Sequence, residues 1–126
     1  MISPTSSVSE IKKGLDNKSF SHKELANFFL NRIEKANKKI NCFITVCKET
    51  ALKEAEAADC KNNAVSSPFS GIPYANKDIF CTSQIRTTCG SKMLENFFPL
   101  YDAEVVRRAK DLGLIMLGKT NMDEFA

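Results

Sequence analysis

The sequence predicts an α/β unit in which helices come first and a strand, a helix and a second strand follow. Three observations carry this prediction. Apolar residues recur at helical spacing within residues 8–15, 22–37 and 48–58, residues 69–80 favour extended structure, and residues 114–117 form a fully apolar run behind a charged helix. A strand, a helix and a strand in this order are expected to form a crossover with two parallel strands in one sheet. We therefore expect a β-α-β unit of a larger mixed sheet.

The first half of the chain is expected to be mainly helical, over residues 1–60. A Ser-x-x-Glu capping box opens each of two helices, at residues 8–15 and 22–37. The β-branched stretch 41–47 is a candidate strand, and the alanine-rich stretch 48–58 is a third helix. With 126 residues and 43% hydrophobic residues, the chain is long enough for one domain with its own core. We expect residues 61–68 to be a connection within that domain, before a second part at residues 69–126.

The strand expected within residues 69–80 carries a lysine near its end. Gly71 and Pro73 lie at the start of this strand, where a proline is tolerated. Burial in such an apolar strand would desolvate the Lys77 ammonium and make it a potential general base. Asp78 should point to the opposite face, because successive strand side chains alternate. Most lysines are solvated surface charges, so a surface lysine without a chemical role is the alternative.

The rest of the chain alternates between loops and regular elements. Residues 81–91 form a polar loop rich in Thr and Ser, whose donors could line a pocket at the carboxyl end of the strand. Asp102 is expected to cap the next helix, and Gly113 to end it. After the apolar strand, Asn121 and Glu124 are expected to cap the start of a further helix that the 126 residues do not complete.

A nucleotide-binding pattern occurs in this region, but its context argues against that function. Gly113 to Thr120 fits G-x-x-x-x-G-K-[ST]. In a phosphate-binding loop the four variable residues form an open turn, whereas here they are Leu, Ile, Met and Leu and are themselves the predicted strand. Lys119 is then most simply a residue at the end of a strand.

Composition excludes several other classes of site. The five cysteines form an odd set without a C-x-x-C pair, which is typical of free thiols in a reducing compartment. His22 is the only histidine, so neither a zinc site nor a Cys/His nucleophile pair is expected. No apolar run approaches the length of a membrane span, and no signal peptide is visible, so we expect a cytoplasmic protein or one from an organelle. With a net charge of +3 and one small cluster at Lys35, Lys38 and Lys39, direct nucleic-acid binding is unsupported.

Five motifs follow one another from residue 70 to the end of the sequence. They are Gly71-Ile72-Pro73, Lys77-Asp78, Thr87-Thr88-Cys89-Gly90-Ser91-Lys92-Met93-Leu94-Glu95-Asn96-Phe97, Tyr101-Asp102-Ala103 and Gly118-Lys119-Thr120-Asn121-Met122-Asp123-Glu124-Phe125. In this order and spacing they resemble the amidase signature family, and most of all its branch of A subunits from tRNA-dependent amidotransferases. Asn76 is a departure, because an apolar residue or histidine is commoner there.

The resemblance implies the amidase signature fold and a catalytic triad of serine, a cis-linked serine and lysine. It assigns the lysine to Lys77 and puts Gly90, Ser91 and Asn121 near the substrate, with no metal site. The two serines are expected beyond Phe125 in the family, so this 126-residue chain is expected to be an inactive N-terminal fragment.

Members of that branch hydrolyse glutamine to ammonia. A partner protein, the B subunit, uses the ammonia with ATP and Mg²⁺ to convert Glu-tRNA(Gln) to Gln-tRNA(Gln), and a small C subunit stabilises the pair. No cofactor is implied for the chain itself, and contact with tRNA would be indirect, through the B subunit. The alternatives are a stand-alone amidase signature hydrolase of small amides and a non-enzymatic interaction or nucleotide-binding module.

Overall fold

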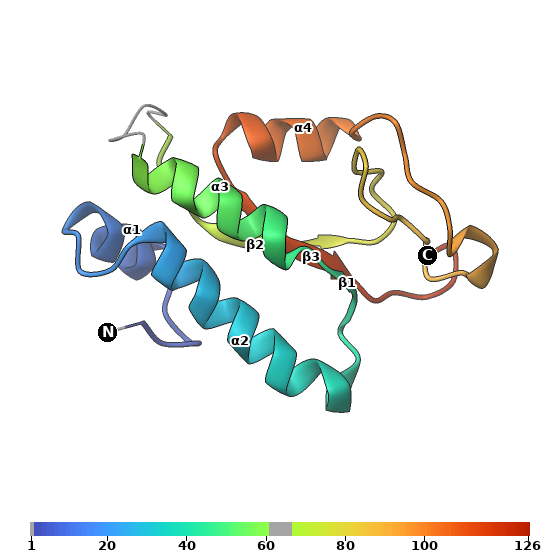
Figure 1. The fold of residues 1–126 in the computed structure, drawn as a ribbon, viewed down its shortest axis with the longest axis horizontal. Coiled ribbons are helices and arrows are strands. Elements are labelled where there is room, and N and C mark those ends of the chain that lie inside the picture. Colours follow the sequence, from blue (N-terminus) through green and yellow to red (C-terminus); the bar gives the residue numbers. More distant parts are fainter. Residues whose placement is uncertain (1, 61–66) are drawn as a thin grey trace.

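A computed structural model describes residues 2–60 and 67–126 of the chain. The expected connection over residues 61–68 lies mostly outside the described residues. In chain order the elements are α1 (Val8–Asp16), α2 (His22–Ile40), β1 (Phe43–Val46), α3 (Lys48–Cys60), β2 (Pro73–Lys77), the short 3-10 helix η1 (Lys92–Leu94), α4 (Glu104–Asp111) and β3 (Ile115–Thr120) (Figure 1). The α/β class and its order, with helices before the β-α-β unit, are confirmed.

The described strands form one mixed sheet with the order β1-β3-β2. β2 and β3 are parallel and joined through α4, as predicted, whereas β1 runs antiparallel to β3. β3 therefore lies in the middle, and four of its six residues are apolar or glycine and buried. Gly118 allows the close approach of β1, since a Cβ there would lie 2.4 Å from the carbonyl oxygen of Thr45. The carboxyl ends of β2 and β3 meet at one end of the sheet, with Lys77 opposite Thr120.

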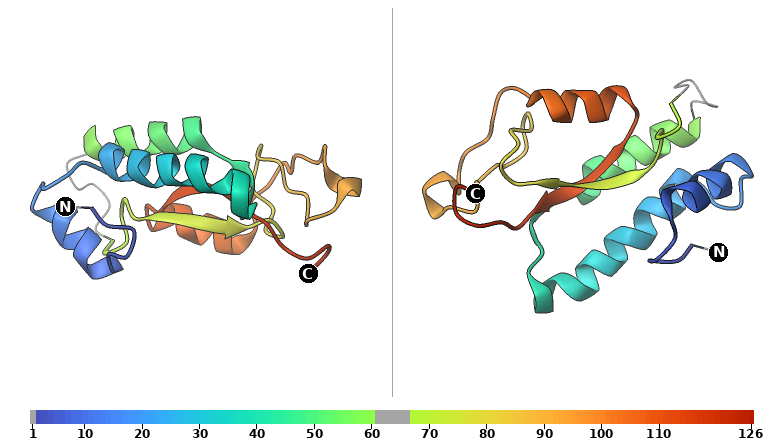
Figure 2. Two further views of the ribbon diagram at one scale, coloured as in Figure 1. Left: turned by 90° about the horizontal axis from the view of Figure 1, so that it is seen from below. Right: turned by 180° about the vertical axis from the view of Figure 1, so that it is seen from behind.

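Two helices form a layer over one face of the sheet. α2 and α3 lie side by side there, while α4 lies toward the other side (Figures 1 and 2). Their apolar stripes meet the central strand in one cluster of buried residues, made of Ala26, Leu30, Ile33, Ala51, Ala55, Ile115 and Leu117. A second cluster joins α1 and α2 to the entrance of β2, through Ile11, Leu15, Leu25 and Ile72. The helical first half is thus packed onto the strands rather than standing apart from them.

Both predicted capping boxes are present. Ser7 and Ser21 each accept a hydrogen bond from the backbone N–H of the glutamate three residues later, and each glutamate accepts one in return from the serine N–H. α2 continues to Ile40, three residues beyond the predicted end, because Asn41 adopts the left-handed conformation (φ 47°) that closes the helix. No helix among the described residues is both long and apolar enough to span a bilayer.

Loss of the α2 cap should destabilise the complete protein measurably. We expect Ser21→Ala to lower the free energy of unfolding by about 1 kcal/mol, because it removes the side-chain acceptor for the Glu24 N–H. Urea unfolding would measure the change. Ser9→Ala is the matched control, since Ser9 lies inside α1 and caps no helix. An equal loss in both variants would contradict the capping role.

Two further boundaries differ from the sequence prediction. β2 ends at Lys77, and the apolar residues Ile79 and Phe80 lie in a turn behind it. Ala103 rather than Asp102 is the residue before α4, and it makes no side-chain cap. The Asp102 carboxylate instead accepts hydrogen bonds from the Ser83 N–H and the Lys110 ammonium, so it ties the loop to the helix.

The expected helix after β3 does not form among the described residues. Asn121 accepts a hydrogen bond from the Met122 N–H, and its amide donates to the carbonyl of Asn41. Glu124 accepts from the Ser91 hydroxyl at 2.6 Å. Both side chains therefore have tertiary partners in place of the helix-capping partners that the sequence pattern suggested.

Candidate functional site

Lys77 is the last residue of β2, at the open carboxyl end of the sheet. Its side chain is exposed, and among the described residues its ammonium has no hydrogen bond and no ion pair. The expectation that the strand would bury it is therefore wrong for this part of the chain, because β2 is an edge strand of the described sheet. The expected alternation is confirmed, since the neighbouring Asp78 is fully buried while Lys77 faces outward.

The buried lysine of this region is Lys119, near the end of β3. It is 0% exposed, and its ammonium donates to the Phe80 carbonyl at 2.9 Å and to the Thr87 hydroxyl at 2.8 Å. It also lies 3.2 Å from Oδ1 of Asp78, an ion-pair contact rather than an aligned hydrogen bond. Burial lowers the pKa of Lys119, and the Asp78 carboxylate opposes that shift. With three partners around its ammonium, this lysine is held in place.

Asp78 is the centre of the polar contacts behind β2. Its Oδ2 accepts two hydrogen bonds from Thr88, at 2.9 Å from the backbone N–H and 2.5 Å from the hydroxyl. The Asp78 carbonyl accepts a further hydrogen bond from the Cys89 N–H. The loop over residues 81–91 is thereby folded onto the ends of β2 and β3 (Figure 1). The hydroxyls of Thr87 and Thr88 do lie at this end of the sheet, but they bind the buried Lys119–Asp78 pair, and a role in lining a pocket stays a prediction.

Lys119 was missed as a special residue from sequence alone. The available signal was its position directly behind an apolar run in a strand expected to be buried on both faces. The strand register adds a second indication, because Lys119 pairs with Asn76 on β2, and Asn76 is itself only 6% exposed. Asn76 donates a hydrogen bond to the Thr82 hydroxyl at 3.3 Å. The unusual asparagine therefore belongs to the same buried polar layer.

Gly90 and Ser91 lie beside the segment that follows β3. Gly90 has φ +69°, and a Cβ there would lie 2.8 Å from the carbonyl oxygen of Met122, so the two backbones are in close contact. Ser91 is buried, and its hydroxyl is shared between Glu124 and the Met93 N–H. Asn121 is exposed, just after the Thr120 that pairs with Lys77. The structure thus gathers Lys77, Gly90, Ser91 and Asn121 at one end of the sheet, and their roles there stay predictions.

The remaining candidate nucleophiles and metal ligands do not form a second site among the described residues. His22 forms a hydrogen bond through Nδ1 with Asp59 at 2.8 Å, and its ring packs against Gly71. The five cysteines are free thiols. In the part of the chain that the structure describes, no group of three or more His, Cys, Asp or Glu side chains could hold a metal ion. Residues 115–120 are strand β3, which agrees with the rejection of a phosphate-binding loop.

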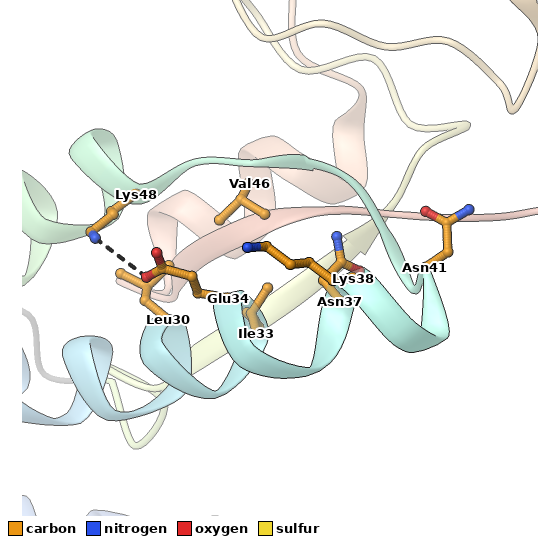
Figure 3. Close-up of a pocket in the computed structure, with 8 residues that line it drawn as sticks. All are labelled: Leu30, Ile33, Glu34, Asn37, Lys38, Asn41, Val46 and Lys48. Carbon is orange, nitrogen blue, oxygen red and sulfur yellow. Dashed lines mark ion pairs between the residues drawn. The ribbon is translucent and has the colours of Figure 1, made fainter.

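A hollow of about 530 Å³ lies elsewhere, between α2 and the segment that links β1 to α3 (Figure 3). Eight residues line it, namely Leu30, Ile33, Glu34, Asn37, Lys38, Asn41, Val46 and Lys48. Its polar groups are partly engaged, because Glu34 pairs with Lys48 at 3.8 Å and Asn37 bonds to the backbone of Phe43. None of the candidate residues at the end of the sheet contributes to it.

Comparison with known proteins gives consistent results. A family model described as Amidase matches residues 24–126. The chain is 54% identical over 121 residues to the A subunit of glutamyl-tRNA(Gln) amidotransferase from Azoarcus sp., and 51% identical over 120 residues to that of Hahella chejuensis. These alignments cover 95% and 94% of the chain, which spans about a quarter (25%) of the length of either relative. The native peptide amidase of Stenotrophomonas maltophilia superposes with a TM-score of 0.91 at 30% identity, over 98% of this chain and 26% of that one.

Proposed function

The chain belongs to the amidase family, and we propose from that membership that Lys77 is the proton-accepting lysine of an amide-hydrolysing site. Its position supports the proposal. Lys77 ends a strand at the carboxyl edge of a sheet, where open α/β sheets bind their ligands. It is also a lysine without a carboxylate partner among the described residues, whereas the ammonium of Lys119 is fully engaged.

In the proposed reaction, neutral Lys77 takes a proton through a bridging serine from a nucleophilic serine. The serine then attacks the amide carbonyl, the proton held by Lys77 passes back through the bridging serine to the amide nitrogen, and ammonia leaves. Water then hydrolyses the acyl-enzyme to the free acid and regenerates the serine. Backbone N–H groups stabilise the oxyanion. Both serines would come from the part of the complete protein that this chain does not span, so the 126 residues alone would be inactive. Gly90, Ser91 and Asn121 would contribute to the wall of the site.

For the substrate we propose glutamine. The observation that carries this proposal is identity of about half, 51% and 54%, to the A subunits of two amidotransferases over nearly the whole chain. Ammonia released from glutamine would pass to a partner protein that uses ATP and Mg²⁺ to amidate Glu-tRNA(Gln). The complete protein would then act with the B and C subunits in translation, and tRNA would contact it only through the B subunit.

A second candidate is a stand-alone hydrolase of small amides. It is favoured by the similarity of the fold to a peptide amidase, at 30% identity. The two candidates differ in their dependence on partner proteins, since one component of an amidotransferase needs the others and an independent hydrolase does not.

Ammonia release from the complete protein separates the two. We expect hydrolysis of glutamine that rises at least about tenfold when the partner proteins and Glu-tRNA(Gln) are added, with little hydrolysis of a simple primary amide such as propionamide. The control is the complete protein with Lys92→Ala, an exposed lysine on η1. Rapid hydrolysis of propionamide without partners, and none of glutamine with them, would favour the stand-alone hydrolase.

A further inference from the structure

The Lys119 ammonium contacts two groups of the turn at residues 77–80, the Asp78 carboxylate and the Phe80 carbonyl. The turn is closed by a hydrogen bond from the Phe80 N–H to the Lys77 carbonyl, at 3.1 Å. The Lys119 ammonium binds the carbonyl of Phe80 at 2.9 Å and pairs with Asp78 at 3.2 Å. One buried side chain from β3 therefore fixes the path of the backbone immediately behind Lys77.

The same contacts separate the charges at the end of β2. Asp78 is the residue next to Lys77, and it is fully buried on the opposite face. Its carboxylate is paired with Lys119 and accepts two hydrogen bonds from Thr88. Lys77 is thus left without a carboxylate partner among the described residues, although a carboxylate adjoins it in sequence.

We propose that Lys119 is a positioning residue for Lys77, which acts by clamping the turn at residues 77–80 and by keeping the Asp78 carboxylate paired on the other face of the strand. This inference rests on the proposed function of Lys77. Lys119 itself touches no substrate in this scheme, because it is 0% exposed. Its contribution is to aim the Lys77 side chain and to keep the neighbouring Asp78 carboxylate paired away from it.

The surroundings of Lys119 support this division of roles. The titratable groups that interact electrostatically with its ammonium are Asp78 in the turn, Cys47 between β1 and α3, and Cys81 and Cys89 in the polar loop. Asp78 is the one carboxylate among them. Loss of the Lys119 charge would therefore leave an unpaired negative charge beside Lys77, which would favour the protonated form of Lys77 and oppose its action as a base.

The test is the pH profile of glutamine hydrolysis by the complete enzyme with its partner proteins. In Lys119→Met we expect kcat to fall about 10- to 100-fold with KM within about twofold, because a base displaced by about 1 Å loses most of its efficiency. The acidic limb of the plot of kcat against pH should move to higher pH by about one unit. This is the effect on Lys77 of one unpaired charge, that of Asp78, within about 10 Å at an effective dielectric constant near 20. In the double variant Asp78→Asn/Lys119→Met the limb should return to its original position, because neither charge remains.

A purely structural role predicts a different result. Loss of folded enzyme lowers the rate equally at every pH and leaves the limb where it was, so an unmoved limb in Lys119→Met would overturn the inference. Should Lys119→Met not fold, Thr87→Val removes one of the three ammonium partners at similar volume. In Thr87→Val we expect kcat to fall about threefold to tenfold with KM unchanged. An unchanged kcat in this variant would also overturn the inference. Lys92→Met, at an exposed lysine, serves as the control.

The inference and the proposed function can fail separately. Substantial activity in Lys77→Ala would show that Lys77 is not the base, and Lys119 would then have no base to position. An inactive Lys77→Ala together with an unmoved limb and a normal kcat in Lys119→Met would leave Lys77 as the base and reject only the role of Lys119.

Discussion

Replacement of Lys77 by alanine in the complete protein is expected to reduce glutamine hydrolysis by roughly 10²- to 10⁴-fold, the contribution of a general base. Folding and assembly with the partner proteins should be unaffected, because the Lys77 side chain is exposed and makes no polar contact among the described residues. Ammonia release under saturating glutamine measures the first effect, and size-exclusion chromatography of the complex measures the second.

Two further variants make this test specific. Lys77→Arg should be as damaging as Lys77→Ala, since a guanidinium keeps its proton and cannot act as a base. Lys92→Ala removes an exposed lysine from the same half of the chain and should retain full activity. Near-normal hydrolysis by Lys77→Ala would show that the base lies elsewhere.

Asp78→Ala is expected to cause the largest loss of stability, about 3–5 kcal/mol in the free energy of unfolding. It leaves the ammonium of Lys119 buried without a carboxylate, and it removes the acceptor for both hydrogen bonds from Thr88. Urea unfolding of the complete protein, followed by circular dichroism, measures the change.

The matched control for this loss is Asp111→Ala. That aspartate also pairs with a basic residue, Arg107, but both side chains are more than half exposed, so its removal should leave stability nearly unchanged. The double variant Asp78→Asn/Lys119→Met should recover part of the loss, because neither charge remains to be buried. A loss below about 1 kcal/mol in Asp78→Ala would mean that the buried pair contributes little to the fold.

Local chemistry explains why much of the fold could be predicted. The two capping boxes fix where α1 and α2 begin, because their hydrogen bonds join residues only three apart in the chain. The apolar run behind a charged helix predicts β3 and its parallel pairing with β2. Predictions that depended on a distant partner were less successful, and Asp102, Asn121 and Glu124 bind residues from other segments instead of capping helices.

For the candidate site, the sequence by itself determined the family resemblance, the choice of Lys77 and the separation of Lys77 from Asp78 on opposite faces of a strand. Only the tertiary structure decided which lysine is buried. The sheet order puts Lys77 on an edge strand and Lys119 on the central one, and the polar loop then covers Lys119 alone. The physical reason is that burial of a charge depends on partners brought from other segments, Asp78, Phe80 and Thr87, which no local pattern around Lys119 specifies.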